Sequence, residues 1–301
     1  MGLSTKKIAE IRITTSPKDK ILEEIRKYIK KGKSQNAKGK SEEIKPLIIF
    51  TPNPEIIVYA QKDKDFVRIV NTAQINLPDG AGVVWALKKL NGISVERISG
   101  ADFMLDLCNL AKRESFTIGL IGGRGGVALE TKECLLKKYP GLKMEVFEAP
   151  EVEMQNAKVK IQKYSSKFKS KQESDKDTSG VTEWAPPMVE ELEERYFISL
   201  INEMKKRKID ILFIALGFPK QEYFIEKIRK TICGKDTSGL IKPLVLMAVG
   251  GSFDYISERV KRAPKWIRNI GLEWLYRLVR EPWRLSRQLK GAKFFWKVLI
   301  S

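Results

Sequence analysis

The chain of 301 residues carries 56 Lys and Arg against 37 Asp and Glu, a formal charge of +19, and it contains no histidine. Without an imidazole, Ser-His-Asp and Cys-His catalytic arrangements and HExxH zinc sites are excluded, so acid–base chemistry falls to carboxylates, Lys, Tyr or a substrate group. The three cysteines form no CxxC pair. This argues against a zinc knuckle or a disulfide framework and fits a reducing, cytoplasmic setting.

Apolar residues make up 43% of the chain, which is enough for a globular core. The longest apolar stretch, Leu244 to Val249, is far shorter than the roughly 18 residues of a membrane span, and the N-terminus lacks a signal-peptide core. We therefore expect a protein that is soluble or bound to a membrane surface.

Short apolar runs alternate with helix-length segments along the chain. The runs are Leu47 to Phe50, Ile75 to Leu77, Phe116 to Gly122, Leu142 to Phe147, Asp210 to Leu216 and Pro243 to Gly250. The helical segments are Pro54 to Thr72, Gly100 to Arg113, Val127 to Tyr139, Met188 to Lys208 and Lys220 to Ile232. Continuous apolar strands separated by helices predict an α/β fold, a mainly parallel sheet with helices on both faces.

Two polar stretches interrupt this alternation. Residues 30–45 are rich in Gly, Ser and Lys, and residues 151–183 are strongly charged. Such composition is typical of surface loops. We predict that both are mobile insertions in a domain that spans residues 1–258.

The remaining residues, 259–301, form a segment that we call the C-terminal appendage. It holds twelve Lys and Arg against two Glu, a net +10, interleaved with aromatic and aliphatic residues. A helical wheel separates an apolar arc from a cationic arc of Arg277, Arg280, Arg284 and Arg287, although Pro282 is expected to end one helix and start another. Such a segment suits anionic lipid, nucleic acid or a polyphosphate substrate; the simpler alternative is a helix with its apolar side on the core.

Small, polar and Gly-rich residues follow five of the predicted strands. They are TPNPE at 51–55, PDG at 78–80, GGRGG at 122–126, GFPKQE at 217–222 and GGSFD at 250–254. Ligands of parallel α/β folds bind beyond the carboxyl ends of the strands, so we expect these turns to meet at one site. Glycines let backbone N–H groups approach a ligand, and a helix start there would favour a diphosphate.

Two of these motifs have alternative interpretations. Gly123, Gly125 and Ala128 fit the G-x-G-x-x-A dinucleotide pattern, with Glu148 as a ribose acceptor, which would indicate a nicotinamide oxidoreductase. Two D-x-D triplets, at 63–65 and 175–177, would suit a metal-dependent sugar-nucleotide enzyme, but neither follows a strand, so we expect no metal site there.

Taken together, seven motifs resemble the WecG/TagA/CpsF glycosyltransferase family of the N-acetylmannosaminyltransferase type. They are TPNPE, LPDGAG, ERISGADF, ALGFPKQE, GGSFD, VKRAP and GLEWLYRLVREPWR, in the family's order, and they place the match over residues 47–147 and 185–300. The resemblance implies a Rossmann-like domain whose appendage helps to form the active site and engages the membrane.

The resemblance also implies roles for individual residues. Asp79, in the PDG motif, would be the general base, with Thr51 beside it and Asn53 lining the same pocket. Arg97 and Gln221 would contact sugar or phosphate, and Asp254, after Gly250 and Gly251, would hold the uridine. Lys261 would bind the diphosphate, and Arg277, Arg284 and Arg287 would reach the leaving group or the lipid diphosphate.

The implied reaction is inverting transfer of a sugar, N-acetylmannosamine or its uronic acid, from a UDP donor to the 4-hydroxyl of GlcNAc on a polyprenyl diphosphate. We expect no cofactor and no metal ion, because cationic side chains offset the charge of the leaving group. The expected location is the inner face of the cell membrane, with the appendage on anionic lipid and no nucleic-acid partner; a homo-oligomer is compatible with the sequence. A basic nucleic-acid-binding protein is the other open alternative, although no base-stacking module is visible.

Overall fold

A computed structural model describes residues 2–37, 45–155, 158–163, 189–234 and 243–282, together with residues 285, 294–296, 298 and 299. At its centre is a six-stranded sheet with the order β4-β3-β10-β9-β5-β6. The strands are β3 (Leu47–Phe50), β4 (Ile75–Asn76), β5 (Thr117–Gly122), β6 (Lys143–Phe147), β9 (Ile211–Ala215) and β10 (Val245–Ala248). All five pairings are parallel, which confirms the predicted α/β fold.

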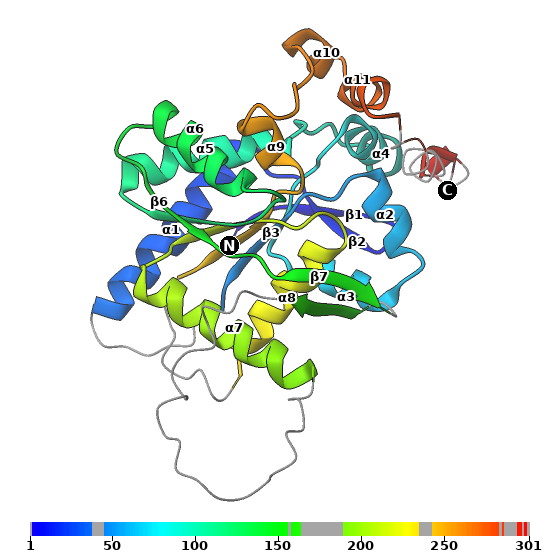
Figure 1. Cartoon of the computed structure of the whole chain (residues 1–301). Helices are drawn as coiled ribbons and strands as arrows, with labels where there is room; N and C mark the ends of the chain where they lie inside the picture. The colour runs from blue at the N-terminus through cyan, green and yellow to red at the C-terminus, as the bar shows by residue number, and fades with distance from the viewer. Residues whose placement is uncertain are drawn as a thin grey trace, which may run out of the picture.

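Helices cover both faces of this sheet (Figure 1). One face carries α1 (Lys18–Ala37), α5 (Gly100–Glu114), α6 (Val127–Lys138) and α9 (Ser252–Ile256); the other carries α2 (Pro54–Ala60), α3 (Lys64–Thr72), α4 (Ala81–Asn91), α7 (Val189–Lys206) and α8 (Lys220–Ile232). Alternate strand residues serve the two cores: Leu47 and Ile49 face α1 and α5, whereas Ile48 and Phe50 face α2 and α3. Continuous apolar strands therefore have a partner on each side.

The prediction of a mobile segment at residues 30–45 is wrong for its first half. Residues 30–37 continue α1, because the buried stripe of Ile21, Ile25 and Ile29 holds this helix against the sheet and Lys, Gln and Ala sustain helical structure. Gly32 suits its helical position because a Cβ there would lie 2.6 Å from the Cβ of Pro243. Residues 38–44 lie outside the described residues.

Other elements were not predicted. An antiparallel hairpin is formed by β1 (Thr5–Ile8) and β2 (Ile11–Thr14). Its strand β2 packs against β4, and its strand β1 packs against α4.

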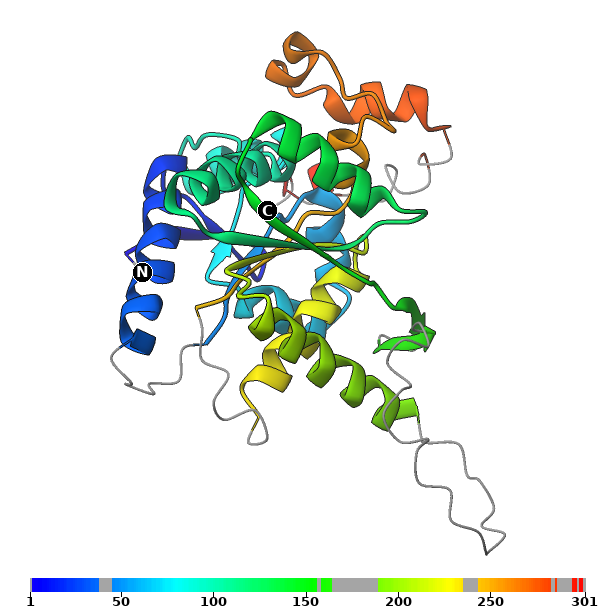
Figure 2. The ribbon, with the colours of Figure 1, turned by 60° about the vertical axis from the view of Figure 1, so that its left-hand side comes forward.

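The predicted helix over 54–72 is two helices, because the Asp63 carboxylate accepts the Phe66 N–H at 2.9 Å and caps α3. The predicted insertion at 151–183 begins with the hairpin β7 (Glu151–Gln155) and β8 (Lys158–Lys163), seen in Figure 2, so its first part is not a loop; residues 164–183 lie outside the described range.

The described part of the appendage lies above the carboxyl ends of the strands (Figure 1). It contains α10 (Lys265–Asn269) and α11 (Glu273–Arg280), and α11 ends ahead of Pro282 as predicted. In the part of the chain that the structure describes, no helix is both long and apolar enough to cross a bilayer.

Candidate active site

The turns that follow the strands converge on one cavity of approximately 1440 Å³. Every one of the five predicted turns contributes residues to its wall. Of the predicted site residues, the lining includes Thr51, Asn53, Asp79, Arg97, Gln221, Gly250, Gly251, Asp254 and Arg277. The expectation that these segments meet at one place is therefore confirmed.

Asp79 lies half-buried in this wall, after β4 and ahead of α4. Its Oδ2 accepts the Gly100 N–H at 3.3 Å. Burial raises the pKa of Asp79 to about 6; the Gly100 hydrogen bond opposes this shift, the Glu273 carboxylate adds to it, and the charges of Arg97 and Arg262 oppose it. Asp79 is thus a carboxylate with raised basicity that is still ionised at neutral pH, as a general base must be.

Thr51 lies beside Gly100, the residue that donates to Asp79. A Cβ on Gly100 would lie 2.9 Å from Cγ2 of Thr51 and 3.5 Å from Oδ2 of Asp79, so only glycine allows these three residues to approach so closely. Gly80, directly after Asp79, has φ 89° and ψ 147°, a backbone conformation open essentially to glycine alone. The sequence PDG therefore does more than make a turn, because it directs the Asp79 side chain to the cavity.

Asn53 and Gln221 line the cavity, but their side chains already form hydrogen bonds to other groups of the protein. The Asn53 Oδ1 accepts the Ile56 N–H at 3.0 Å and caps α2. The Gln221 Oε1 accepts the Gly250 N–H at 2.9 Å, and its Nε2 donates to the buried Glu222 at 3.0 Å. Both residues thus hold turns in place, and the Gly250 N–H is not available to a ligand.

Asp254 and Arg277 lie together beside the GGSFD turn. The Arg277 guanidinium stands 4.8 Å from the Tyr255 ring centroid, and a Cβ on Gly251 would lie 3.2 Å from its Nη2. Gly251 thus leaves room for the guanidinium at the cavity wall. The helix that starts here, α9, has five residues, so its dipole contributes little to anion binding.

One predicted residue, Lys261, is not found at the cavity. Lys261 is exposed and does not line it. Arg284 and Arg287 lie outside the described residues. Instead, Arg124 of the Gly-rich loop and Lys220 of α8 add cations to the wall, which the strand-end rule could have suggested because both follow strands.

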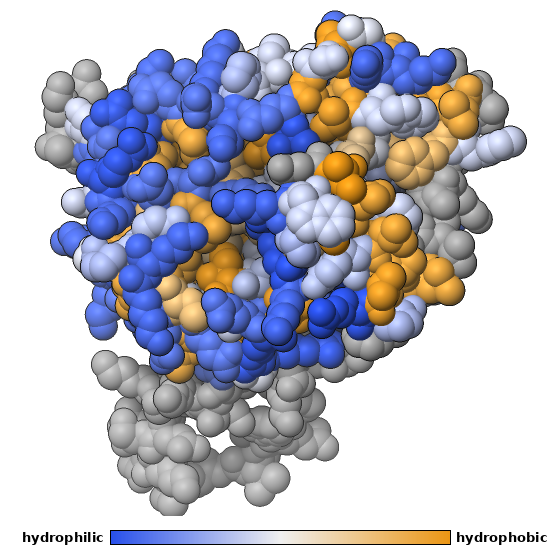
Figure 3. All heavy atoms as spheres, turned by 90° about the horizontal axis from the view of Figure 1, so that it is seen from above, coloured by the Kyte–Doolittle hydropathy of each residue, from blue (hydrophilic) through white to orange (hydrophobic). Residues whose placement is uncertain are grey.

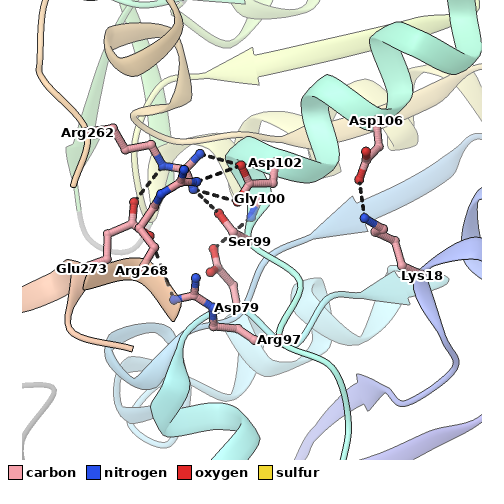
Figure 4. Close-up of polar contacts among 10 residues, drawn as sticks. All are labelled: Lys18, Asp79, Arg97, Ser99, Gly100, Asp102, Asp106, Arg262, Arg268 and Glu273. Atoms are coloured by element: carbon pink, nitrogen blue, oxygen red, sulfur yellow. Dashed lines mark hydrogen bonds and ion pairs between the residues drawn. The ribbon is translucent and has the colours of Figure 1, made fainter. Parts of the chain in front are cut away.

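The next residue, Arg262, was not predicted as a site residue, yet its side chain points towards α5 and α11. Arg262 donates to Asp102, Ser99 and Glu273, and thereby joins α5 to α11 (Figure 4). Arg97 also approaches Glu273, at 4.0 Å. No signal in the sequence separates Arg262 from Lys261, because which of two adjacent cations faces inward depends on the tertiary contacts.

One side of the cavity mouth is apolar. It includes Trp85, Ile270, Leu272, Trp274 and Phe295, the last with its ring centroid 5.5 Å from that of Trp85. A Cβ on Gly82 would lie 2.9 Å from Phe295, and one on Gly271 would lie 2.7 Å from Ala81, so these glycines let the appendage rest against the start of α4. Seen from above, hydrophobic residues gather on the half of this face that the appendage covers (Figure 3).

Metal-binding side chains do not gather at this site. Within the described ranges, no group of three or more Cys, Asp and Glu is arranged to hold a metal ion. Of the first D-x-D triplet, Asp63 caps α3 and accepts the Tyr223 hydroxyl at 2.9 Å, and Asp65 pairs with Arg68. The second triplet lies outside the described residues.

Comparison with known proteins finds similarity over nearly the whole chain. The family model described as "Glycosyl transferase WecG/TagA/CpsF family" matches residues 6–301. Two similar proteins, from Bacillus subtilis (strain 168) and Bacillus spizizenii (strain ATCC 23059 / NRRL B-14472 / W23), are both named N-acetylglucosaminyldiphosphoundecaprenol N-acetyl-beta-D-mannosaminyltransferase. The first is 29% identical over 252 residues, 84% of this chain and 78% of its own; the second is 28% identical over 255 residues, 85% and 79%.

The capping role of Asn53 predicts an effect of its substitution on stability. Asn53→Ala removes the cap of α2 and should lower the free energy of unfolding by about 1 kcal/mol. Asn53→Asp keeps an acceptor for the Ile56 N–H and should retain the stability of the parent. Urea denaturation of the three proteins measures this; equal stability of the alanine variant and the parent would contradict the role.

Proposed function

Because the chain belongs to the WecG/TagA/CpsF family and is a glycosyltransferase, we propose that it transfers N-acetylmannosamine from UDP to a lipid-linked acceptor. The acceptor is the 4-hydroxyl of GlcNAc on a polyprenyl diphosphate, and the anomeric carbon is inverted. The names of the two Bacillus relatives supply the sugar and the acceptor class. Their β-linked product is what inversion of an α-linked donor gives.

The observation that carries this proposal is the position of Asp79 on a cavity large enough for both substrates. The family match includes the whole cavity wall and the appendage. In a chain without histidine, a carboxylate of raised pKa is a suitable base for a sugar hydroxyl.

The proposed chemistry is a single displacement. As the acceptor oxygen bonds to the anomeric carbon, the bond from that carbon to the UDP oxygen breaks and UDP leaves with the electron pair. The acceptor proton passes to the Asp79 carboxylate late in the reaction, when the sugar resembles an oxocarbenium ion. Thr51, in contact with the same turn, helps to fix the hydroxyl.

Cations on the cavity wall offset the charge that develops on the departing diphosphate. Arg277, Arg124 and Lys220 surround the side of the cavity formed by the turns after β5, β9 and β10. Fixed guanidinium and ammonium groups stabilise such charge without reorganisation during the reaction. Asp254, on the same side, is the proposed contact of the uridine.

The apolar mouth and the appendage suit an acceptor that lies in a membrane. Trp266 and Val279 are 66% and 73% exposed, and Trp296 is 69% exposed. Such side chains enter the headgroup boundary, while Lys and Arg add about 1 kcal/mol each near anionic lipid. We therefore place the enzyme peripherally on the inner face of the cell membrane.

The family assignment does not support the oxidoreductase alternative. The Gly-rich loop at 122–126 lines the same cavity as Asp79, so it fits a sugar nucleotide as part of one site. Calorimetry with NAD(H) and NADP(H) tests the alternative directly. No described feature favours the nucleic-acid alternative, because the exposed aromatic residues lie on helices of the appendage rather than on a sheet face.

The function predicts a defined product profile. With a short-chain GlcNAc diphosphate lipid as acceptor, UDP-N-acetylmannosamine should give UDP and a disaccharide lipid. UDP-glucose, UDP-galactose and the UDP-linked uronic acid of N-acetylmannosamine should give less of both products. EDTA should leave the rate unchanged, because the cavity wall supplies the cations. Chromatography of UDP and of the lipid product measures both results.

One control and two contrary outcomes belong to this assay. Omission of the acceptor lipid should abolish UDP release beyond slow hydrolysis. Loss of turnover in EDTA that Mg²⁺ or Mn²⁺ restores would contradict the metal-independent mechanism, and transfer from none of the donors would contradict the function itself.

The role of Asp79 predicts both a mutational and a pH effect. Asp79→Asn should lower kcat by about 10²- to 10⁴-fold, the usual worth of a general base. Because burial raises the pKa of Asp79 to about 6, the free enzyme carries the active carboxylate above that pH. The value of kcat/KM should therefore fall as pH drops through about 6, and a flat profile between pH 5 and 8 would argue against this base.

Membrane binding by the appendage predicts a selective effect of surface substitutions. Trp266→Ser combined with Val279→Ser should reduce flotation with anionic vesicles but keep turnover of a soluble short-chain acceptor, since neither residue lines the cavity. Leu129→Ser is the matched control, because Leu129 is an apolar residue that is 53% exposed on α6 and does not belong to the appendage. Equal flotation of the double variant and the control would refute the proposal.

A further inference from the structure

The guanidinium of Arg262 joins three elements at the edge of the cavity (Figure 4). Its Nη1 and Nη2 donate to the two carboxylate oxygens of Asp102 at 2.6 and 2.9 Å, and Nη2 also donates to the Ser99 hydroxyl at 3.0 Å. Its Nε donates to Glu273 at 2.8 Å. Ser99 and Asp102 belong to the start of α5, and Glu273 belongs to the first turn of α11.

These contacts are strong by type. The Asp102 pair is bidentate, the geometry that a guanidinium makes best and that an ammonium cannot reproduce. Burial works to raise the pKa of Asp102, but the hydrogen bond and charge of Arg262 outweigh it and hold that pKa below its usual value. Arg262 itself is 17% exposed and does not line the cavity, so it is not placed to touch a substrate.

The same contacts lead directly to Asp79. Ser99 is the N-cap residue of α5, and Asp102 is the third residue of that helix. Arg262 therefore binds residues on both sides of Gly100. The Gly100 N–H is the group that donates to Asp79. Any movement of the first turn of α5 therefore moves the hydrogen bond that orients this carboxylate.

We propose that Arg262 is a positioning residue for Asp79, and that through Glu273 it couples the seating of the appendage to the orientation of this carboxylate. The proposal rests on the function proposed above for Asp79. A simple packing role would not depend on charge, whereas Arg262 and Glu273 carry opposite charges that act on Asp79 in opposite directions.

Three charged groups act on Asp79: Glu273 in α11, Arg97 before α5, and Arg262 before α10. Asp102 in α5 and Arg268 in α10 belong to the same group of ion pairs, because Asp102 pairs with both Arg262 and Arg268. Removing Arg262 takes away a positive charge and leaves Glu273 and Asp102 less compensated, so the pKa of Asp79 should rise. Removing the charge of Glu273 should lower it. A loss of folding alone would not shift the two pH profiles in opposite directions.

The test uses the full-length enzyme with Arg262→Gln, Arg262→Lys and Glu273→Gln. For Arg262→Gln we expect kcat to fall by about 10²-fold, an unchanged KM for the UDP-sugar, and an acidic limb of kcat/KM that moves to higher pH. Glu273→Gln should move that limb to lower pH. Arg262→Lys keeps the charge but not the bidentate contact, so its limb should stay near that of the parent while kcat falls.

Asp106→Asn is the matched control. Asp106 lies one turn further along α5 and pairs with Lys18 at 3.2 Å, without contact to Arg262 (Figure 4). Its kcat and pH profile should equal those of the parent. If Arg262→Gln does not fold, as thermal unfolding would show, two other results still decide the proposal: the shift of the acidic limb to lower pH in Glu273→Gln, and the lower kcat with an unmoved limb in Arg262→Lys.

A second measurement separates this proposal from the proposed function. Carbon-13 NMR of Asp-labelled enzyme, with Asp79→Asn to assign the signal, reports the titration of Asp79 without turnover. Opposite shifts in Arg262→Gln and Glu273→Gln support the coupling even if no UDP-sugar reacts. Titration unchanged in both variants, or a parental kcat in Arg262→Gln, would overturn it.

Discussion

The four central strands of the parallel sheet, β3, β10, β9 and β5, are buried on both faces, and this constraint determines where the molecule can bind a ligand. These strands give residues to two separate cores, so neither face of the central sheet remains open to a ligand. Only the turns at the carboxyl ends are left, and there the backbone can bring short polar segments together from five places in the sequence. The site is thus a consequence of how the sheet is covered, and the appendage closes its open side.

The absence of histidine gives this site its chemical character. A carboxylate in water is a weak base, but Asp79 lies half-buried, and desolvation shifts its pKa towards the range in which a base is useful. Arginines and lysines on the wall supply positive charge, which suits the diphosphate leaving group of the proposed reaction. Asp79 and these cations come from different segments, so in the proposed reaction the uncharged hydroxyl and the charged diphosphate bind on separate walls.

The appendage is attached by more than hydrophobic contact. Phe294 and Ala263 are buried, and Gly82 and Gly271 permit close approach to α4, but the specific link is the group of ion pairs around Arg262. Such a group fixes orientation more than it adds stability, because burying charges costs much of what their attraction returns. This explains how a segment with exposed apolar side chains can still present a defined face to the cavity.

The sequence by itself determined the strands of the six-stranded sheet, the helices α5 to α8 and the convergence of the strand-end motifs on one site, because burial on both faces and turn chemistry are local properties of the chain. The position of Asp79 followed from the same argument. Only the tertiary structure decided that residues 30–37 continue α1, that Gln221 binds the Gly250 N–H, and that Arg262 rather than Lys261 contacts α5 and α11. The fold brings Gly250 to Gln221 and Asp102 to Arg262 from far along the chain, whereas the cap that Asn53 provides for α2 is a local contact with Ile56. A pattern of residue types cannot specify which of several polar groups will find its partner there.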